Sequence, residues 1–162
     1  MRLLAISGSY HRGGAIDRLI DRAIEGARAA DPSLEVDRIR LVDKRILYCT
    51  NCESCKKDDP AKPAARCVID DEMQAIYPLI ERADAYLFGT PVNVGHETAV
   101  MKAFIERIAW VFARPSKRWV PLKGCPEPRS PRKKRAAVSG LVTEATSNTA
   151  SCVRTGRSDG FM

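Results

Sequence analysis

An apolar run gives way to turn-forming residues and then to a helical pattern in Arg2-Leu-Leu-Ala-Ile-Ser-Gly-Ser-Tyr-His-Arg-Gly-Gly-Ala-Ile16. Residues 2–7 form a short and largely apolar run, which is typical of a buried parallel strand. Residues 9–14 are mostly polar or glycine, as in a tight turn. From Ala15 onward apolar residues recur at helical spacing, which predicts a helix over residues 15–30 with one apolar face. A strand, a small loop and a helix in this order indicate an α/β fold.

The loop between this strand and helix has the composition of an anion site. Backbone N–H groups at a helix N-terminus favour a negatively charged ligand. The residues that could complete a phosphate cradle are Ser7, Ser9, His11, Arg12, Gly13 and Gly14. A plain connecting turn could have the same composition, and the loop matches neither a Walker loop nor a dinucleotide fingerprint. The residues therefore predict a candidate phosphate site and leave the plain turn open.

The rest of the chain continues the alternation of strands and helices. Apolar residues over 34–41 predict a second strand, and residues 83–89 and 136–143 predict a third and a fourth. Helical spacing predicts a short helix from Met73 to Ile80 and a longer one over residues 100–112. Right-handed crossovers between parallel strands place such helices on both faces of an open sheet.

Length and composition indicate one domain. The chain has 162 residues, of which 44% are hydrophobic and 29% charged, an ordinary globular composition. We assign residues 1–143 to the domain and residues 144–162, which are polar and show no apolar pattern, to a tail. A fifth strand is apparently missing.

The apolar runs are too short for a membrane protein. None approaches the roughly 20 residues of a membrane-spanning helix. The N-terminal segment Met1-Arg-Leu-Leu-Ala-Ile-Ser-Gly8 is too short and too soon interrupted for a signal peptide. We therefore expect a cytoplasmic protein without a membrane partner.

The net charge of +7 is concentrated in one segment. Residues 114–135 contain nine basic side chains, one acidic side chain and five prolines. A protein that binds nucleic acid usually spreads its basic side chains over one face. The pattern favours a solvated loop, with contacts to an anionic cofactor or partner as the alternative, and we expect no nucleic-acid partner.

Four of the six cysteines lie in an irregular loop over residues 46–69. Cys49, Cys52 and Cys55 stand at three-residue intervals, and Cys67 follows after eleven intervening residues. In a cytoplasmic protein such cysteines more often bind metal or act chemically than form disulfides. Thiolates suit both iron–sulfur clusters and zinc. The four are candidate ligands of a [4Fe–4S] cluster, and a structural zinc site or free redox thiols remain alternatives.

A third loop follows the predicted strand at residues 83–89. Ligands of open α/β sheets bind beyond the carboxyl ends of the strands, so this loop should lie near the first loop and the cysteine loop. Its candidate binding residues are Pro91, Val92, Asn93, Val94 and Gly95.

Taken in this order, four motifs resemble the flavodoxin-like NAD(P)H-dependent FMN reductase family, and within it the iron–sulfur flavoproteins. The motifs are Ile6-Ser-Gly-Ser9 with Gly13-Gly14, the evenly spaced cysteines followed by Cys67-Val-Ile-Asp-Asp71, Gly89-Thr-Pro-Val92, and Met101-Lys-Ala-Phe-Ile-Glu-Arg107. The resemblance runs from about residue 2 to residue 143. It implies a flavodoxin-like open parallel sheet with helices on both faces.

The resemblance also implies an activity. It implies an FMN-dependent oxidoreductase that takes electrons from NAD(P)H or a protein donor, with the [4Fe–4S] cluster as a second redox centre where the cysteines hold one. The FMN phosphate would lie in the first loop and the flavin ring against residues 91–95. Partners would be small-molecule or protein electron donors and acceptors, in a homo-oligomer whose neighbouring chain helps to enclose the flavin.

Three positions depart from the family pattern. Ala15 and Ile16 stand where relatives usually have Asn and Thr in the phosphate loop, and Asn93 stands where an aromatic residue is common. No catalytic side chain is expected, because a flavin carries the hydride chemistry itself. The alternatives are a non-enzymatic flavin and iron–sulfur electron carrier, or a redox- or metal-responsive cysteine protein.

Overall fold

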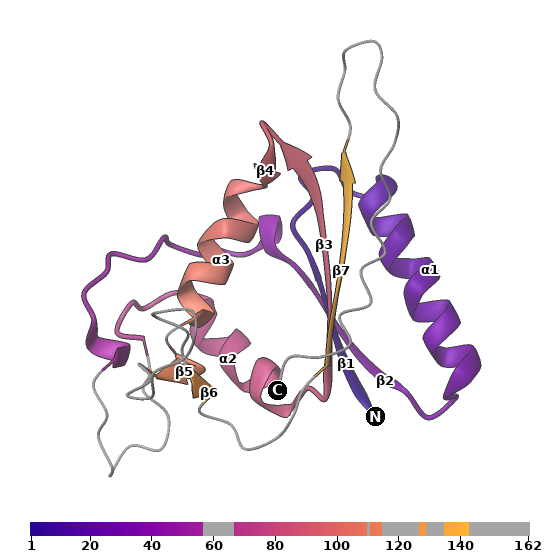
Figure 1. The fold of residues 1–162 in the computed structure, drawn as a ribbon, viewed down its shortest axis with the longest axis horizontal. Coiled ribbons are helices and arrows are strands. Elements are labelled where there is room, and N and C mark those ends of the chain that lie inside the picture. Colours follow the sequence, from indigo (N-terminus) through magenta and orange to yellow (C-terminus); the bar gives the residue numbers. More distant parts are fainter. Residues whose placement is uncertain (57–66, 110, 115–126, 129–134, 143–162) are drawn as a thin grey trace.

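The computed structural model of the chain describes residues 1–56, 67–109, 111–114, 127–128 and 135–142 (Figure 1). Its main elements are β1 (Arg2–Ser7), α1 (Ala15–Ala30), β2 (Glu35–Arg40), α2 (Met73–Arg82), β3 (Ala85–Asn93), α3 (Ala99–Ala109) and β7 (Arg135–Val142). The shorter ones are η1 (Leu41–Asp43), η2 (Ser54–Lys56), β4 (His96–Glu97), β5 (Ala113–Arg114) and β6 (Glu127–Pro128).

Four parallel strands form the sheet in the order β2-β1-β3-β7. This is the strand order of flavodoxin-like folds, in which the first strand lies between the second and the third. The predicted fold class is therefore confirmed. The short strand β4 pairs antiparallel with the end of β3, so the sheet is mixed rather than wholly parallel. A fifth parallel strand is not found among the described residues.

The two faces of the sheet are covered by different helices, α1 on one side and α2 with α3 on the other (Figure 1). Successive side chains of a strand point to opposite faces. Leu3 and Ala5 accordingly pack in one cluster with α1, and Leu4 and Ile6 pack in the other with α2 and α3. Burial on both faces explains why the sequence of β1 is almost continuously apolar.

Strand β3 is longer than the sequence predicted. The prediction ended the strand at Gly89 and made residues 90–95 a loop, but β3 continues to Asn93. The reason is pairing on both sides, since β7 accompanies β3 as far as Val92 and β4 pairs with its last two residues. Four of the six predicted loop residues, Thr90 to Asn93, therefore belong to the strand, and only Val94 and Gly95 form the turn.

The basic segment and the tail lie largely outside the described residues. Within residues 114–135, where no regular structure was predicted, β6 pairs antiparallel with β5. The tail at residues 144–162 is wholly outside the described ranges. A search of the described helices finds none with the length and apolar character needed to cross a membrane.

Helix α1 packs closely against β3 at Gly89. A Cβ atom at this position would lie 2.7 Å from Cδ1 of Ile20 and 2.9 Å from Cγ2 of Ile16. Both distances are shorter than ordinary carbon contacts, so a side chain here would push the helix away from the sheet.

We predict that Gly89→Ala lowers the free energy of unfolding by about 1–3 kcal/mol, as overpacking does elsewhere. Urea unfolding followed by circular dichroism measures this change. Gly26→Ala is the matched control, because Gly26 lies within α1 with open space around its Cα. The control should raise stability by about 0.5–1 kcal/mol through helix propensity. Equal effects of the two substitutions would contradict the close approach.

Candidate functional site

The loop after β1 lies beside the middle of β3 and the start of α3. The N–H of Gly8 donates to the carbonyl oxygen of Gly89 at 2.8 Å, and Thr98 Oγ1 donates to the carbonyl oxygen of Gly8 at 2.8 Å. The N–H of Thr98 in turn donates to Thr90 Oγ1 at 3.3 Å. These bonds join the first loop, the end of β3 and the start of α3 in one rigid corner.

The cysteine segment takes a different course. It starts near the carboxyl end of the sheet, after β2 and η1, and then runs along the side of α2 and α3 (Figure 1). The expectation that the cysteine loop gathers with the first and third loops is therefore wrong. The cysteines lie apart from them, on the face of the sheet opposite α1.

The first loop leaves the N-terminus of α1 open. Gly13 adopts a φ of +64°, a conformation that favours glycine, and Gly14 is the N-cap residue without a side-chain capping bond. The first amide groups of a helix have no partner within the helix, and their dipoles attract anions. The loop thus has the backbone form of a phosphate site.

The side chains of the loop have distinct environments. Ser9 is buried, and its Oγ donates to the carbonyl oxygen of His11 at 3.1 Å and lies 3.2 Å from the N–H of His11. His11 itself is exposed. Arg12 reaches Asp43 with Nη2 at 2.7 Å from Oδ1. Ser9 therefore shapes the loop, while His11 and Arg12 lie at its surface.

The carboxylate of Asp17 binds the first loop on its buried side. This carboxylate, only 4% exposed, accepts hydrogen bonds from Ser7 Oγ at 2.9 Å and from the N–H of Gly13 at 2.8 Å. It also pairs with Arg40 and, at 3.5 Å, with Arg38. Burial alone would raise the pKa of Asp17, but these hydrogen bonds and the two arginine charges lower it on balance. The fully buried Ser7 is thus a support for Asp17, beneath the surface of the loop.

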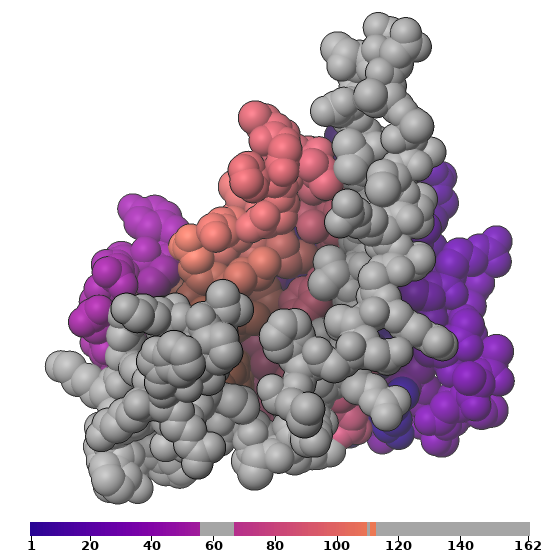
Figure 2. All heavy atoms as spheres, in the orientation of Figure 1, coloured from indigo at the N-terminus to yellow at the C-terminus, as the bar shows by residue number. Residues whose placement is uncertain are grey.

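The third loop presents mostly exposed residues. Pro91 and Val92 are half-buried at the end of β3, and Asn93, Val94 and Gly95 are exposed. Val94 is 99% exposed and has a φ of +50°, which is unusual for a branched side chain. In the space-filling view the hairpin of β3 and β4 projects at the upper edge of the molecule (Figure 2).

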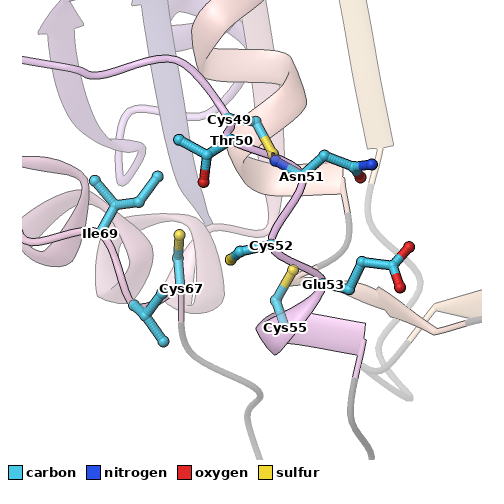
Figure 3. Close-up of a pocket in the computed structure, with 9 residues that line it drawn as sticks. Cys49, Thr50, Asn51, Cys52, Glu53, Cys55, Cys67 and Ile69 are labelled. Carbon is cyan, nitrogen blue, oxygen red and sulfur yellow. Dashed lines mark hydrogen bonds between the residues drawn. The ribbon is translucent and has the colours of Figure 1, made fainter.

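The four cysteines of the motif line one pocket of about 330 Å³, a volume that includes space open to solvent. Cys52 and Cys55 reach it from η2 and the residues before it, and Cys67 reaches it from the segment leading to α2 (Figure 3). Within the described ranges, no three potential ligand side chains already converge on a single metal position. The pocket therefore gathers the donors without closing them around one point.

The thiols influence one another. Burial raises the pKa of Cys55, and the negative charges of Cys67, Cys49 and Cys52 raise it further. Hydrogen bonds from Ser54 lower the pKa of the exposed Cys52. These mutual effects are consistent with four thiols within electrostatic reach of each other.

Comparison with known proteins decides the family. The family model for NADPH-dependent FMN reductases matches residues 1–122. The chain belongs to this family. Among curated relatives, an iron–sulfur flavoprotein of Archaeoglobus fulgidus is 32% identical over 116 residues, which cover 72% of this chain and 49% of the relative. One of Methanosarcina thermophila is 31% identical over 107 residues, which cover 66% and 52%. The chain spans about half the length of these relatives.

Solved structures agree on the fold. A putative quinone reductase from Klebsiella pneumoniae superposes with a TM-score of 0.62 at 19% identity, covering 88% of this chain and 59% of the other. A flavone reductase superposes with a TM-score of 0.60 at 20% identity, covering 88% and 43%. The family and the flavodoxin-like fold predicted from the motifs are thus confirmed.

The role of Asp17 was not predicted from the sequence, although a signal was present. Asp17 lies three residues before Ile20 and seven before Ile24, so it falls on the apolar face of its helix. A charged residue on such a face usually has a buried partner. Its partners, Arg38 and Arg40, come from β2, so the pattern of the helix alone could not identify them.

We predict that Asp17→Asn lowers the free energy of unfolding by about 1–3 kcal/mol, because it removes the charge of the buried carboxylate that pairs with Arg40 and Arg38. The folded-state pKa of Asp17 is depressed, so its contribution to stability is present above the unfolded value of about 3.9 and is lost as pH falls through the folded value. The difference between wild type and variant should therefore shrink in acid.

Urea titrations from neutral pH to about pH 2 check this window. Glu25→Gln is the control, since Glu25 lies on the same helix in an exposed pair with Arg22. Exposed pairs are screened by solvent, so the control should change little at any pH. A wild-type–Asp17→Asn difference that stays constant into acid would mean that the Asp17 carboxylate does not stabilise the fold.

Proposed function

We propose that the chain is an FMN-dependent oxidoreductase that takes electrons from NAD(P)H or a protein donor. The observation that carries the proposal is the open, glycine-lined N-terminus of α1 beside the end of β3, in a member of the FMN reductase family. In open α/β sheets this position, beyond the carboxyl ends of neighbouring strands, is where ligands bind.

The first loop fits a phosphate group. Gly13 and Gly14 allow close approach of a ligand to the backbone, and α1 has no side-chain cap that would compete for its first amide groups. The carboxylate of Asp17 lies beneath the loop, but Arg38 and Arg40 compensate its negative charge. Ala15 and Ile16 offer no polar side chain, and the Ser9 hydroxyl is bonded to His11, so the backbone would carry most of the binding.

The protein's share in the reaction is position and electrostatics. FMN, when bound, would accept a hydride and pass electrons on one at a time. Loop residues 9–14 would bind its phosphate, and residues 91–95 would lie against its ring. We further propose a homo-oligomer, with no nucleic-acid partner; sedimentation velocity measures the oligomeric state.

A second part of the proposal concerns the cysteines. We propose that Cys49, Cys52, Cys55 and Cys67 hold a [4Fe–4S] cluster, which would supply one-electron transfer. Support comes from the chemistry of the donor set, four thiols on one pocket, and from relatives named iron–sulfur flavoproteins. A cluster would have to draw the sulfur atoms closer together than they lie here.

We predict that Ala15→Glu weakens FMN binding about tenfold, because a carboxylate in the first turn repels the phosphate. The same substitution should not destabilise the fold, since acidic residues suit a helix N-terminus. Fluorescence titration of the apoprotein with FMN gives the dissociation constant. Ala15→Asn, which restores a polar side chain, should bind FMN more tightly than wild type.

The matched control for this experiment is Ala29→Glu. Ala29 is exposed on the same helix, about 21 Å from Ala15 along its axis. It changes the net charge equally but lies beyond the Debye length of about 10 Å. If both glutamates weaken binding alike, or neither does, the phosphate is not at α1.

The electron donor separates the two candidate functions. Bleaching of the flavin by NADPH supports the reductase, and bleaching by reduced ferredoxin alone would make the chain an electron carrier instead.

We predict that alanine in place of any one of the four motif cysteines abolishes the cluster while leaving FMN binding unchanged. Iron and sulfide analysis after anaerobic reconstitution measures the first effect, and flavin titration measures the second. Cys152→Ala, outside the motif, is the control and should retain the cluster. If the protein binds one zinc ion and no iron, the cluster proposal is wrong and the four cysteines form a structural zinc site.

A further inference from the structure

Two of the four family-like motifs meet in one buried ion pair. Asp71 ends the motif that begins at Cys67, and Arg107 ends the motif on α3. Arg107 donates from Nη1 to Asp71 Oδ2 at 2.6 Å and from Nη2 to Oδ1 at 2.9 Å. Neither side chain has any exposed surface. Nothing in the FMN site described above uses this pair.

The pair also holds the segment that leads to the first cysteine. The N–H of Leu47 donates to Asp71 Oδ2 at 2.8 Å, and Arg107 Nη1 donates to the carbonyl oxygen of Leu47 at 2.8 Å. Both backbone groups of this residue are therefore bound by the ion pair. Leu47 lies two positions before Cys49, so the start of the cysteine segment is fixed to α3.

The segment that carries the last cysteine is fixed to the same place. Asp71 is four positions after Cys67, and its Oδ1 accepts a hydrogen bond from the N–H of Met73 at 3.0 Å. Gln74 donates from Nε2 to the carbonyl oxygens of Cys67 and Ile69, at 2.9 and 2.8 Å. The backbone on both sides of the cysteine pocket is thus tied to one buried support.

The carboxylate keeps the guanidinium charged. Burial tends to lower the pKa of Arg107, but its hydrogen bond to Asp71 and the negative charge of that carboxylate raise it on balance.

We propose that the Asp71–Arg107 pair is the positioning device that brings Cys67 to Cys49, Cys52 and Cys55. Eleven residues separate Cys55 from Cys67, and closing a loop of that length in the chain costs conformational entropy. By binding Leu47 and the start of α2 at once, the pair fixes the two ends of the cysteine segment in advance. The inference rests on the proposed use of the four cysteines as one ligand set.

A purely structural ion pair is the alternative. Buried ion pairs are weak evidence for stability, because desolvation offsets their attraction. The two roles differ in what the loss of Arg107 should change. A structural pair affects the whole fold, whereas a positioning pair affects the distance between Cys67 and the other thiols while the fold persists.

The test measures that proximity without metal or flavin. The 162-residue chain is prepared with Cys49, Cys52, Cys125 and Cys152 replaced by serine. Cys55 and Cys67 are then equilibrated with reduced and oxidised glutathione. One oxidised glutathione becomes two reduced molecules as the two protein thiols form a disulfide. The ratio gives the effective concentration of one thiol at the other. Repeating it at two pH values separates proximity from any change in thiol ionisation.

We expect Arg107→Met to lower this effective concentration by about tenfold or more, since the two ends of the segment lose their common support. Arg107→Lys keeps the charge but not the planar fork that reaches both carboxylate oxygens and Leu47. It should give an intermediate value, and it serves as the test if Arg107→Met does not fold. An effective concentration within about twofold of the parent in a folded Arg107 variant would overturn the proposal.

Two controls separate positioning from general destabilisation. Arg82→Met removes another two-pronged pair, in which Arg82 Nη2 contacts both oxygens of Asp37 at 3.0 and 2.9 Å, away from the cysteines. Ile24→Ala weakens the core on the α1 face of the sheet. Neither should change the effective concentration, and a fall in either as large as that in Arg107→Met would make the effect one of stability. Absence of iron in wild type would end the cluster proposal and leave this measurement intact.

Discussion

The structure depends on the placement of β1 between two parallel neighbours and two layers of helix. Its backbone pairs with β2 over Arg2–Ser7 and with β3 over Leu3–Ser7. Leu4, Ala5 and Ile6 have no exposed surface. A strand held on both edges and both faces cannot shift its register without exposing its whole apolar set. The loop that follows it therefore starts from a fixed point.

The first loop and the cysteine segment are each held by a buried carboxylate near the start of a helix. Asp17 in α1 binds Gly13 of the first loop, and Asp71 before α2 binds Leu47 of the cysteine segment. Each carboxylate pairs with an arginine from a different element. An acid near a helix N-terminus interacts favourably with the helix dipole, and the arginine compensates the charge that burial would otherwise disfavour. Irregular backbone is thus fixed by polar bonds where apolar packing cannot reach it.

The sequence predicted what local pattern determines. Residues 15–30 were predicted as a helix and are one, because the stripe of Ile16, Ile20 and Ile24 has helical spacing over the whole length. The end of β3 was not predictable in this way, since it depends on pairing with β7 and β4, which are distant or very short in the sequence. The two motifs that contain Asp71 and Arg107 indicated the family, but only the fold shows that the two residues touch.

The first loop and the cysteine segment are held in place by separate sets of polar contacts. The first and third loops are fixed to the sheet, and the cysteine segment is fixed to α2 and α3 through Arg107. Neither set of contacts uses a residue of the other, so a change in the cysteines can leave the first loop intact. The elements still share one core, in which Met73 and Phe104 pack beneath β1. The first loop and the cysteine segment are thus built on one core, yet each has its own polar anchor, so either can change while the fold is kept.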